Sequence, residues 1–332
     1  MSLASMHKEG EVLDGRFLLR EPIAQGGMAT VFKAEDLHNR CAVVVAKVLL
    51  PAFSSGLGSW SMFQREEEIG LRLHHPYVLK FVALPADKRR TYLITEYVAG
   101  PTLADRLRHG PLGEAQALSI ASRLCEAVDY VHRQGFVHYD VKPANVILCP
   151  DGGLRLIDFG LAHEEATRYG SWLAASPAIA SSGYAAPEQI RRRRGRKSAD
   201  IYALGATLYE MLTGRPPFAG DDPFVVASAR TIGDPVAPSA LNSSISPEVE
   251  EIVLRALRRK PEERYSSAAA MKTDLDRPQA VAVSGLSARL RPVTRWRRYL
   301  RLARYATFVA ALPILFHAAL FALLWWHFAG RR

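Results

Sequence analysis

Two carboxylates, an amide and a lysine lie close together in one part of this chain. They are Asp140, Lys142, Asn145 and Asp158. Carboxylate and amide oxygens are the ligands that Mg²⁺ prefers, and a lysine supplies positive charge for a phosphate. The interval between Asp140 and Asp158 is long enough for a short β-hairpin. The pattern therefore predicts a site that holds magnesium on a polyphosphate and orients a hydroxyl group against the terminal phosphorus.

A further lysine, Lys47, lies inside a near-continuous apolar run, residues 43–50, that is typical of a strand. A buried ammonium group without an anion is costly, so Lys47 is expected either to meet an anion or to reach solvent from an edge strand. The helix predicted at residues 60–74 carries three consecutive glutamates, residues 66–68. Because neighbouring positions on a helix point in different directions, only one of the three can face Lys47.

Residues 17–34 are expected to form two strands around a glycine-containing bend, residues 23–31. Glycine lets a backbone approach a phosphate without interference from a Cβ atom. Gly26 and Gly27 therefore suit a bend that covers a nucleotide. An ordinary hairpin turn has the same composition, and the bend alone does not decide between the two.

Two more strands are expected at residues 79–84 and 91–97. A long helix follows at residues 111–134, because its apolar positions recur at the spacing of one buried helical face. Gly135 ends this helix, as glycine commonly does at a helix C-terminus. The residues with catalytic chemistry thus come directly after a buried helix that can position them.

The ordered set of these segments resembles the eukaryotic-type (Hanks-type) serine/threonine protein kinases, bacterial branch. The segment His-Tyr-Asp-Val-Lys-Pro-Ala-Asn, residues 138–145, is similar to the family's catalytic loop, and Asp158-Phe-Gly to its magnesium loop. Further matches are Val-Ala-Lys47, the run Ala186-Pro187-Glu188 and Leu-Thr-Gly-Arg-Pro-Pro-Phe at residues 212–218. The likeness covers residues 16–275.

The resemblance implies an α+β, two-lobed protein kinase fold. A small β-rich N-lobe is expected at residues 16–98 and a larger helical C-lobe at residues 99–276, after an N-terminal extension of residues 1–15. A basic linker, residues 277–305, and one C-terminal transmembrane helix, residues 306–329, would follow.

The family's roles carry over to the matching positions of this sequence. Asp140 would accept or orient the proton of the substrate hydroxyl, and Lys142 would lie over the γ-phosphate of ATP. Asn145 and Asp158 would bind Mg²⁺, with Mn²⁺ as an alternative. The other expected ATP-binding residues are Ile23, Gly26, Gly27 and Val31 in the bend, Lys47 with its partner Glu66, and the backbones of Glu96 and Val98.

Further residues are expected to support the site. Glu188 and Arg264 would form a buried ion pair, and Asp200 would hold the backbone of the catalytic loop. Tyr139 departs from the family, whose usual arginine there docks a phosphorylated activation loop by charge-assisted bonds. We therefore expect activity that does not depend on phosphorylation of that loop.

The formal charge of +10 is concentrated in the last part of this 332-residue chain. Residues 277–332 hold ten arginines and no Asp or Glu, so the rest has 33 basic and 33 acidic residues. This distribution argues against a nucleic-acid partner. Three scattered cysteines have no metal-ligand spacing and indicate reduced thiols of a cytosolic domain. No signal peptide is expected, because charges interrupt residues 1–19.

Residues 306–329 contain no Asp, Glu, Lys or Arg. A helix of this length is about 36 Å long, enough to cross a ~30 Å hydrocarbon core, whereas a buried core helix would seldom be apolar on every side. Five arginines precede the segment and two follow it, so the kinase side is expected in the cytoplasm. This predicts a single-pass protein of the cell membrane that contacts lipid and has no domain beyond the span. It leaves open whether two spans pair into a homodimer.

The sequence therefore predicts an ATP-dependent kinase that phosphorylates serine or threonine in protein substrates. A pseudokinase-like membrane scaffold is the alternative, because Ala24 and Ala29 replace the outer glycines of the family's bend. A small-molecule kinase is disfavoured by the presence of both Glu188 and Arg264. The basic run at residues 191–197 stays open between a solvated face and a docking surface for acidic substrates or lipid headgroups.

Overall fold

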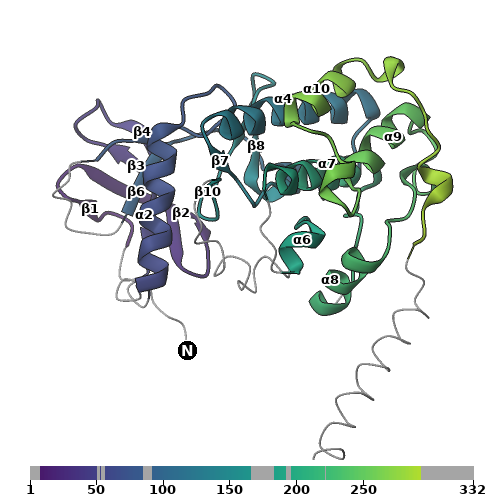
Figure 1. Ribbon diagram of the computed structural model, residues 1–332. Coiled ribbons are helices and arrows are strands. Elements are labelled where there is room, and N and C mark those ends of the chain that lie inside the picture. Colours follow the sequence, from purple (N-terminus) through teal and green to yellow (C-terminus); the bar gives the residue numbers. More distant parts are fainter. Residues whose placement is uncertain are drawn as a thin grey trace, which may run out of the picture.

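The structure, a computed structural model, describes residues 8–50, 53, 57–84, 92–165, 183–191, 196–220 and 222–292. In this part, the chain forms a small lobe built on a β-sheet and a larger helical lobe, as the sequence predicted (Figure 1). No helix among these residues has the length and apolar character needed to cross a membrane. The expected transmembrane helix, residues 306–329, lies outside the described residues.

The small lobe is a six-stranded sheet whose strand order is β1-β2-β3-β4-β6-β5, with neighbouring strands antiparallel. Its strands are β1 (Val12–Leu13), β2 (Phe17–Gln25), β3 (Ala29–Asp36), β4 (Ala42–Leu49), β5 (Phe81–Val82) and β6 (Tyr92–Glu96). β1 lies within residues 1–15, which were expected to precede the lobe, and Leu13 is fully buried. The sheet therefore begins before residue 16.

β4 explains why one apolar run carries a lysine. Ala46 and Val48 are buried in the core on one face of the sheet, and Lys47 points to the other face because side chains alternate along a strand. Lys47 pairs with Val31 of β3 and with Leu93 of β6. β4 is thus a central strand, and the edge-strand alternative for Lys47 is wrong.

The helix α2 (Leu57–Arg72) lies against this sheet and carries Glu66 (Figure 1). Phe63 and Ile69 of α2 are buried in the core shared by the two lobes. Gly70 allows close packing, since a Cβ atom there would lie 2.4 Å from the ring of Phe81 in β5. The position of Glu66 is therefore set by a tight contact between helix and sheet.

The larger lobe is organised around α7 (Lys197–Thr213), in which every residue from Ala199 to Tyr209 is buried. α4 (Glu114–Arg133) packs one apolar face against α7, and a Cβ atom on Gly205 of α7 would lie 2.6 Å from the Cβ of Ala256 in α9. The other helices are α3 (Leu103–Leu107), α6 (Pro187–Ile190), α8 (Pro223–Ile232), α9 (Pro247–Ala256) and α10 (Ala268–Asp276), with short 3-10 turns η1 (Pro143–Asn145), η3 (Pro238–Ala240), η4 (Pro261–Glu263), η5 (Pro278–Ala280) and η6 (Ser287–Arg289).

Short strands carry the loops that hold the candidate catalytic residues. They are β7 (Phe136–Val137), β8 (Val146–Leu148), β9 (Leu154–Leu156) and β10 (His163–Glu164). β8 and β9 form the hairpin expected between Asp140 and Asp158, and β7 pairs with β10. β9 also meets the small lobe, because the Leu156 N–H donates to the Tyr77 carbonyl (2.8 Å) and the Leu79 N–H donates to the Leu156 carbonyl (3.0 Å). Main-chain hydrogen bonds thus join the two lobes beside the site.

The chain stays on the helical lobe after α10. Residues 277–292, named here the C-terminal strap, pack against α9 and end beside Asp234, just after α8. Glu251 of α9 is buried and accepts hydrogen bonds from the Ser284 hydroxyl and from a backbone N–H of the strap. The Arg291 N–H donates to the carboxylate of Asp234 (3.0 Å). The first part of the expected linker is therefore docked on the lobe.

Candidate active site

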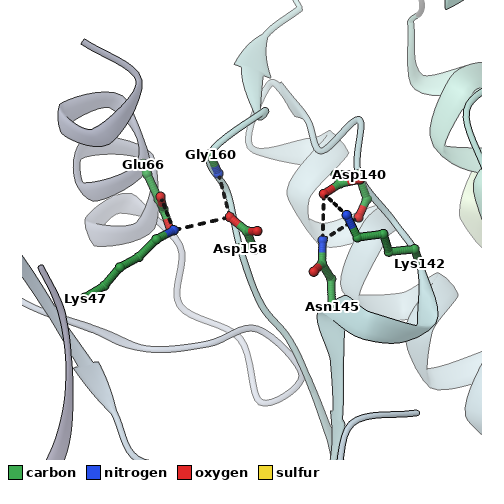
Figure 2. A network of polar contacts seen from close by, with 7 residues as sticks. All are labelled: Lys47, Glu66, Asp140, Lys142, Asn145, Asp158 and Gly160. Carbon is green, nitrogen blue, oxygen red and sulfur yellow. Dashed lines mark hydrogen bonds and ion pairs between the residues drawn. The ribbon is translucent and has the colours of Figure 1, made fainter. Parts of the chain in front are cut away.

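Lys47 and Glu66 form an ion pair between β4 and α2 (Figure 2). The Lys47 Nζ atom lies 2.7 Å from each carboxylate oxygen of Glu66 and 3.5 Å from Oδ1 of Asp158. Of the three consecutive glutamates, it is Glu66 that meets the lysine. One ammonium group thus joins the sheet, the helix and the loop after β9, which are far apart in the sequence.

Burial and charge act against each other in this pair. Burial lowers the pKa of Lys47, but the carboxylates of Asp158 and Glu66 outweigh it, and the pKa of Lys47 lies above its usual value. Burial raises the pKa of Glu66 to about 7; Lys47 opposes this rise and Asp158 adds to it. Lys47 therefore keeps its charge across the neutral pH range and offers it to a bound anion.

Asp158 has a positive φ angle of 67°, a backbone conformation that residues other than glycine rarely adopt. The Gly160 N–H donates to its Oδ1 (3.3 Å), and a Cβ atom on Gly160 would lie 3.3 Å from that oxygen and 3.4 Å from Oε2 of Glu66. Glycine is favoured at 160 because two carboxylates approach it. Burial would raise the pKa of Asp158, but Lys47 and the Gly160 N–H outweigh it, so the pKa is lowered and the carboxylate stays ionised.

Phe159 anchors this loop between the lobes. Its fully buried ring meets Phe81 of β5 and His138 of the catalytic loop edge-on, with ring centroids 6.4 Å and 4.8 Å away. His138 is also fully buried, and burial lowers its pKa. His138 therefore contributes packing and stays neutral.

Asp140, Lys142 and Asn145 form a compact group on the loop before β8 (Figure 2). Lys142 Nζ lies 2.7 Å from Oδ2 of Asp140, and Asn145 Nδ2 donates to the same oxygen and to the Asp140 carbonyl, both at 2.9 Å. Burial raises the pKa of Asp140, and Lys142 opposes the rise. A carboxylate oriented in this way can accept a proton from a hydroxyl group placed beside it.

The donor chemistry of this group fits Mg²⁺. The Nδ2 atom of Asn145 is bound to Asp140, and its Oδ1 points away from Asp140 in Figure 2. Asp158 lies between the Lys47 pair and this group in the same view. Mg²⁺ takes oxygen ligands and usually keeps waters and substrate phosphates. Among the described residues, no group of three or more His, Cys, Asp or Glu side chains is placed so that it could hold a metal ion by itself.

A buried carboxylate beneath the catalytic loop fixes its backbone. Asp200, in the first turn of α7, accepts hydrogen bonds from the N–H groups of His138 and Tyr139, both at 2.8 Å. Tyr139 has a φ angle of 64°, so the chain turns sharply where Asp200 holds it. The ring Nε2 of His132 lies 2.8 Å from Oδ2 of Asp200. Sequence analysis missed His132, whose signal was a polar side chain on the buried face of α4.

The bend between β2 and β3 is exposed. Ile23, Gly26 and Gly27 lie on its surface, and Val31 is half-buried. The Gly26 N–H donates to the Ala29 carbonyl (2.9 Å), which closes the turn. A Cβ atom on Gly27 would meet no atom within 4 Å, so the packing of the described residues does not explain why glycine stands there.

Residues 95–100, named here the connector, join the small lobe to the large one. Thr95 is buried and Val98 is half-buried. The Glu96 N–H donates to the Lys80 carbonyl (2.9 Å), and the Glu96 carbonyl accepts a hydrogen bond from the Thr95 hydroxyl (3.3 Å). The Glu96 side chain accepts from Nε of Arg155 in β9 (3.2 Å). Sequence analysis missed Arg155, since nothing near it in the sequence points to a partner on the connector.

Glu188 of α6 and Arg264 form a buried ion pair. Nη1 and Nη2 of Arg264 lie 2.7 and 2.8 Å from the two carboxylate oxygens of Glu188, and the arginine side chain is fully buried. Arg264 also donates to the carbonyl groups of Ser198, Arg258 and Arg259. The start of α6 is thereby tied to the start of α7 and to the loop after α9.

The two ends of the basic run 191–197 make contacts within the lobe. Arg191 donates to the Thr231 carbonyl of α8 (2.6 Å), and Lys197 pairs with Glu165 (2.9 Å). Residues 192–195 lie outside the described residues.

The chain is similar in sequence to a known protein family and to several of its members. Residues 17–275 match the family described as protein kinase domain. The serine/threonine-protein kinase PknB of Mycolicibacterium smegmatis is 36% identical over 270 residues, and that of Mycobacterium tuberculosis is 35% identical over 271. A probable serine/threonine-protein kinase of Streptomyces coelicolor is 34% identical over 274 residues.

The matches cover most of this chain and a smaller share of the relatives. The two PknB matches cover 80% of this chain and 43% of the relative, and the Streptomyces match covers 81% and 41%. Among solved structures, the kinase domain of Mycobacterium tuberculosis PknI has a TM-score of 0.63 at 24% identity, covering 82% of this chain and 99% of that one. That likeness shows the fold.

Proposed function

The chain belongs to the protein kinase family, and on this basis we propose that it transfers the γ-phosphoryl group of ATP to serine or threonine hydroxyls of proteins. The observation that carries the proposal is the contact of Lys47 with Glu66 and Asp158, beside the group formed by Asp140 and Asn145. The relatives named serine/threonine-protein kinases support the choice of acceptor.

In the transfer, the substrate hydroxyl oxygen forms a bond to the γ-phosphorus while the bond from that phosphorus to the bridging oxygen of ADP breaks. Asp140 would take the hydroxyl proton, and the rise of its pKa by burial makes it a better proton acceptor than an exposed aspartate. Lys142, 2.7 Å from Asp140, would place positive charge beside the γ-phosphate. The released electron pair stays on ADP.

The remaining site residues would hold the nucleotide. Lys47, oriented by Glu66, would bind the α- and β-phosphates, and Asn145 with Asp158 would hold Mg²⁺, which neutralises phosphate charge when bound. Gly27 supports this proposal. No described atom lies close enough to require glycine at this position, and the lack of a side chain would let the backbone of the bend approach a phosphate closely.

The test is transfer of label from radiolabelled ATP to generic protein substrates by the wild type, Asp140→Asn and Lys47→Met. We expect the variants to lose roughly a hundredfold or more in rate, since each removes a group that acts on the transferring phosphate. Equal incorporation of label by all three proteins would refute the proposed kinase activity. Background incorporation by the wild type would favour the scaffold alternative, and ATP consumption with small acceptors alone would favour a small-molecule kinase.

We also propose that residues 306–329 anchor the kinase in the cell membrane, with the two lobes in the cytoplasm. The support is the absence of charged residues in that segment and the excess of arginines before it. The full chain should stay in the membrane pellet at alkaline pH, whereas a chain ending at Pro292 should not. Protease added outside intact cells should spare the kinase lobes. Release of the full chain by alkali would refute the anchor.

A further inference from the structure

The largest fully buried side chain among the described residues is an arginine. Arg230 lies on α8, close to its C-terminal end, and has 0% of its surface exposed. Burial lowers the pKa of its guanidinium group, and Tyr202 opposes this effect. Removing a cation from water is costly, so such a residue needs a role beyond filling space.

Arg230 reaches the segment that leads into α6. Its Nη1 atom donates to the carbonyl oxygen of Ala185 (2.9 Å). A few residues later, in the first turn of α6, Glu188 is held by Arg264. Tyr202 of α7 is a neighbour of both arginines, with the Arg264 guanidinium carbon 5.0 Å from its ring centroid. Two buried arginines thus hold this segment and the first turn of α6 that follows it.

Ala185 also contacts the active site. The side chains of Tyr139, which precedes Asp140, and of Leu161, which follows the magnesium loop, pack against Ala185. Ala185 is 5% exposed. Its backbone is therefore set by α8 through the carbonyl group and by the catalytic loop through side-chain packing. A shift of Ala185 would change the place of this segment relative to Asp140.

Other contacts attach α8 to the lobe without reaching Ala185. Val226 and Ala229 of α8 pack with Phe218. Arg259 donates to the Ile232 carbonyl at the end of α8 (3.1 Å). Arg230 therefore differs from these residues in contacting the segment that packs against Tyr139, the residue before Asp140.

We propose that Arg230 is a positioning residue for protein substrates. By holding the Ala185 carbonyl, it fixes the backbone against which a peptide segment of the substrate lies next to Asp140. This inference rests on the proposed kinase function and deepens it. It concerns the protein substrate alone, because the nucleotide-binding lysine, Lys47, lies in the other lobe.

The test compares Arg230→Met and Arg230→Gln with the wild type in the full chain. Methionine keeps an unbranched apolar stem without a donor, and glutamine keeps an N–H donor without the charge. For Arg230→Met, we expect the KM for a protein substrate to rise about tenfold, as the loss of the charged donor to the Ala185 carbonyl implies. The KM for ATP and the rate of ATP hydrolysis without protein substrate should stay at the wild-type values. Arg230→Gln should recover part of the loss.

Arg259→Met is the matched control, since it removes an arginine that holds α8 without contact to Ala185. It should lower the temperature of thermal unfolding and leave the KM for the protein substrate unchanged. The inference is overturned by an unchanged KM in Arg230→Met, by an equal rise in the KM for ATP, or by an equal rise in Arg259→Met. If Arg230→Met does not fold, the same criteria are applied to Arg230→Gln.

This experiment distinguishes failure of the role of Arg230 from failure of the proposed kinase function. An active wild type with an unaffected Arg230→Met overturns the role of Arg230 alone. A wild type that transfers no phosphate to any protein, although it folds, overturns the kinase proposal and this inference with it.

Discussion

The backbone of the catalytic loop depends on Asp200, a carboxylate on α7 that would not touch the substrate. It is fully buried and lies within hydrogen-bond distance of His132, the His138 N–H and the Tyr139 N–H. Burial would raise its pKa, but the hydrogen bonds from His132 and from the His138 N–H outweigh it, so the pKa of Asp200 is lowered. The ionised form is therefore favoured in the folded protein, and it adds to stability at any pH above the ordinary aspartate pKa.

Asp200→Asn should lower the free energy of unfolding by about 3 kcal/mol at neutral pH, because a neutral amide replaces a charged acceptor of buried hydrogen bonds. The gap between wild type and variant should stay constant from about pH 8 to pH 5 and shrink below about pH 4, where the wild-type carboxylate of the unfolded chain takes up a proton first. Urea unfolding at a series of pH values measures the gap. A gap that already shrinks between pH 8 and pH 6 would contradict this assignment.

Tyr139 stands where the family's arginine would bind a phosphorylated loop, and it packs against Ala185 instead. An aromatic ring cannot make charge-assisted bonds to a phosphate. Thr167, Ser171 and Ser176, the candidate acceptors in the following segment, lie outside the described residues.

The triple variant with alanine at positions 167, 171 and 176 should phosphorylate a peptide at a rate within about threefold of the wild-type rate. The reason is that position 139 has no arginine to bind a phosphorylated loop residue. Tyr139→Ala should lose more activity than the triple variant, because it removes the packing under Ala185. Initial rates with one peptide substrate measure both. Collapse of the triple variant to background would show that loop phosphorylation is required after all.

At the scale of single elements, α6 is a short helix whose place is set by a buried ion pair. Glu188 and Arg264 meet through two hydrogen bonds, and Arg264 serves three carbonyl groups besides. The arginine is therefore the more connected partner, because its loss would leave four acceptor groups without their donor.

Removing either partner of this pair should cost roughly 3–5 kcal/mol, since the other charge would remain buried and unpaired. Arg264→Leu should lie at the upper end of that range and Glu188→Gln at the lower end. Urea unfolding of the two variants, followed by circular dichroism, measures the difference. A larger loss of stability in Glu188→Gln than in Arg264→Leu would contradict the greater role of Arg264.

The C-terminal strap is a second element with a structural role. Glu251 is 7% exposed and accepts hydrogen bonds from Ser284 and from the Leu286 N–H, and Asp234 accepts one from the Arg291 N–H. The strap thus donates hydrogen bonds to two carboxylates of the helical lobe.

A chain ending at Pro292 should unfold at the same temperature as the wild-type lobes, whereas a chain ending at Asp276 should be less stable by about 2 kcal/mol, because the buried Glu251 loses its strap donors. Differential scanning calorimetry of the two truncated chains measures the difference. In the chain ending at Asp276, Glu251→Leu should restore part of the loss. Equal stability of the two truncations would show that the strap contributes nothing.

At the scale of the whole molecule, the proposed nucleotide site lies where the two lobes meet. Lys47 and Glu66 come from the small lobe, and Asp140 and Asn145 from the large one, with Asp158 in contact with Lys47. The Glu96–Arg155 pair and the main-chain bonds of β9 also cross this boundary. A ligand bound by both sides would stabilise the folded protein as a unit.

Mg²⁺ with ATP should therefore raise the unfolding temperature of the wild type, with a stabilisation of about 2.7 kcal/mol at a nucleotide concentration a hundred times Kd. Chelation of the metal should remove most of the shift in the wild type. In Asp158→Asn the shift should be small and equal with and without metal. Differential scanning fluorimetry measures all four conditions, and a metal-dependent shift of full size in Asp158→Asn would exclude Asp158 as a ligand.

Local sequence predicted the chemistry of the site, which stays a prediction, and the family resemblance predicted the two-lobed fold, which is confirmed. Asp140, Lys142, Asn145 and Asp158 lie in two loops close in sequence, and their residue types indicate magnesium and phosphate before any fold is known. The apolar run at residues 43–50 formed a strand as predicted, because side-chain alternation and strand propensity are properties of the local chain.

Tertiary structure decided which buried polar groups meet. The central place of β4, the contacts of Arg155 and Arg230 and the docking of the strap all depend on partners that lie far away in the sequence. A buried charge is tolerated only where packing brings a partner to it, and packing is a property of the whole chain rather than of the segment that carries the charge.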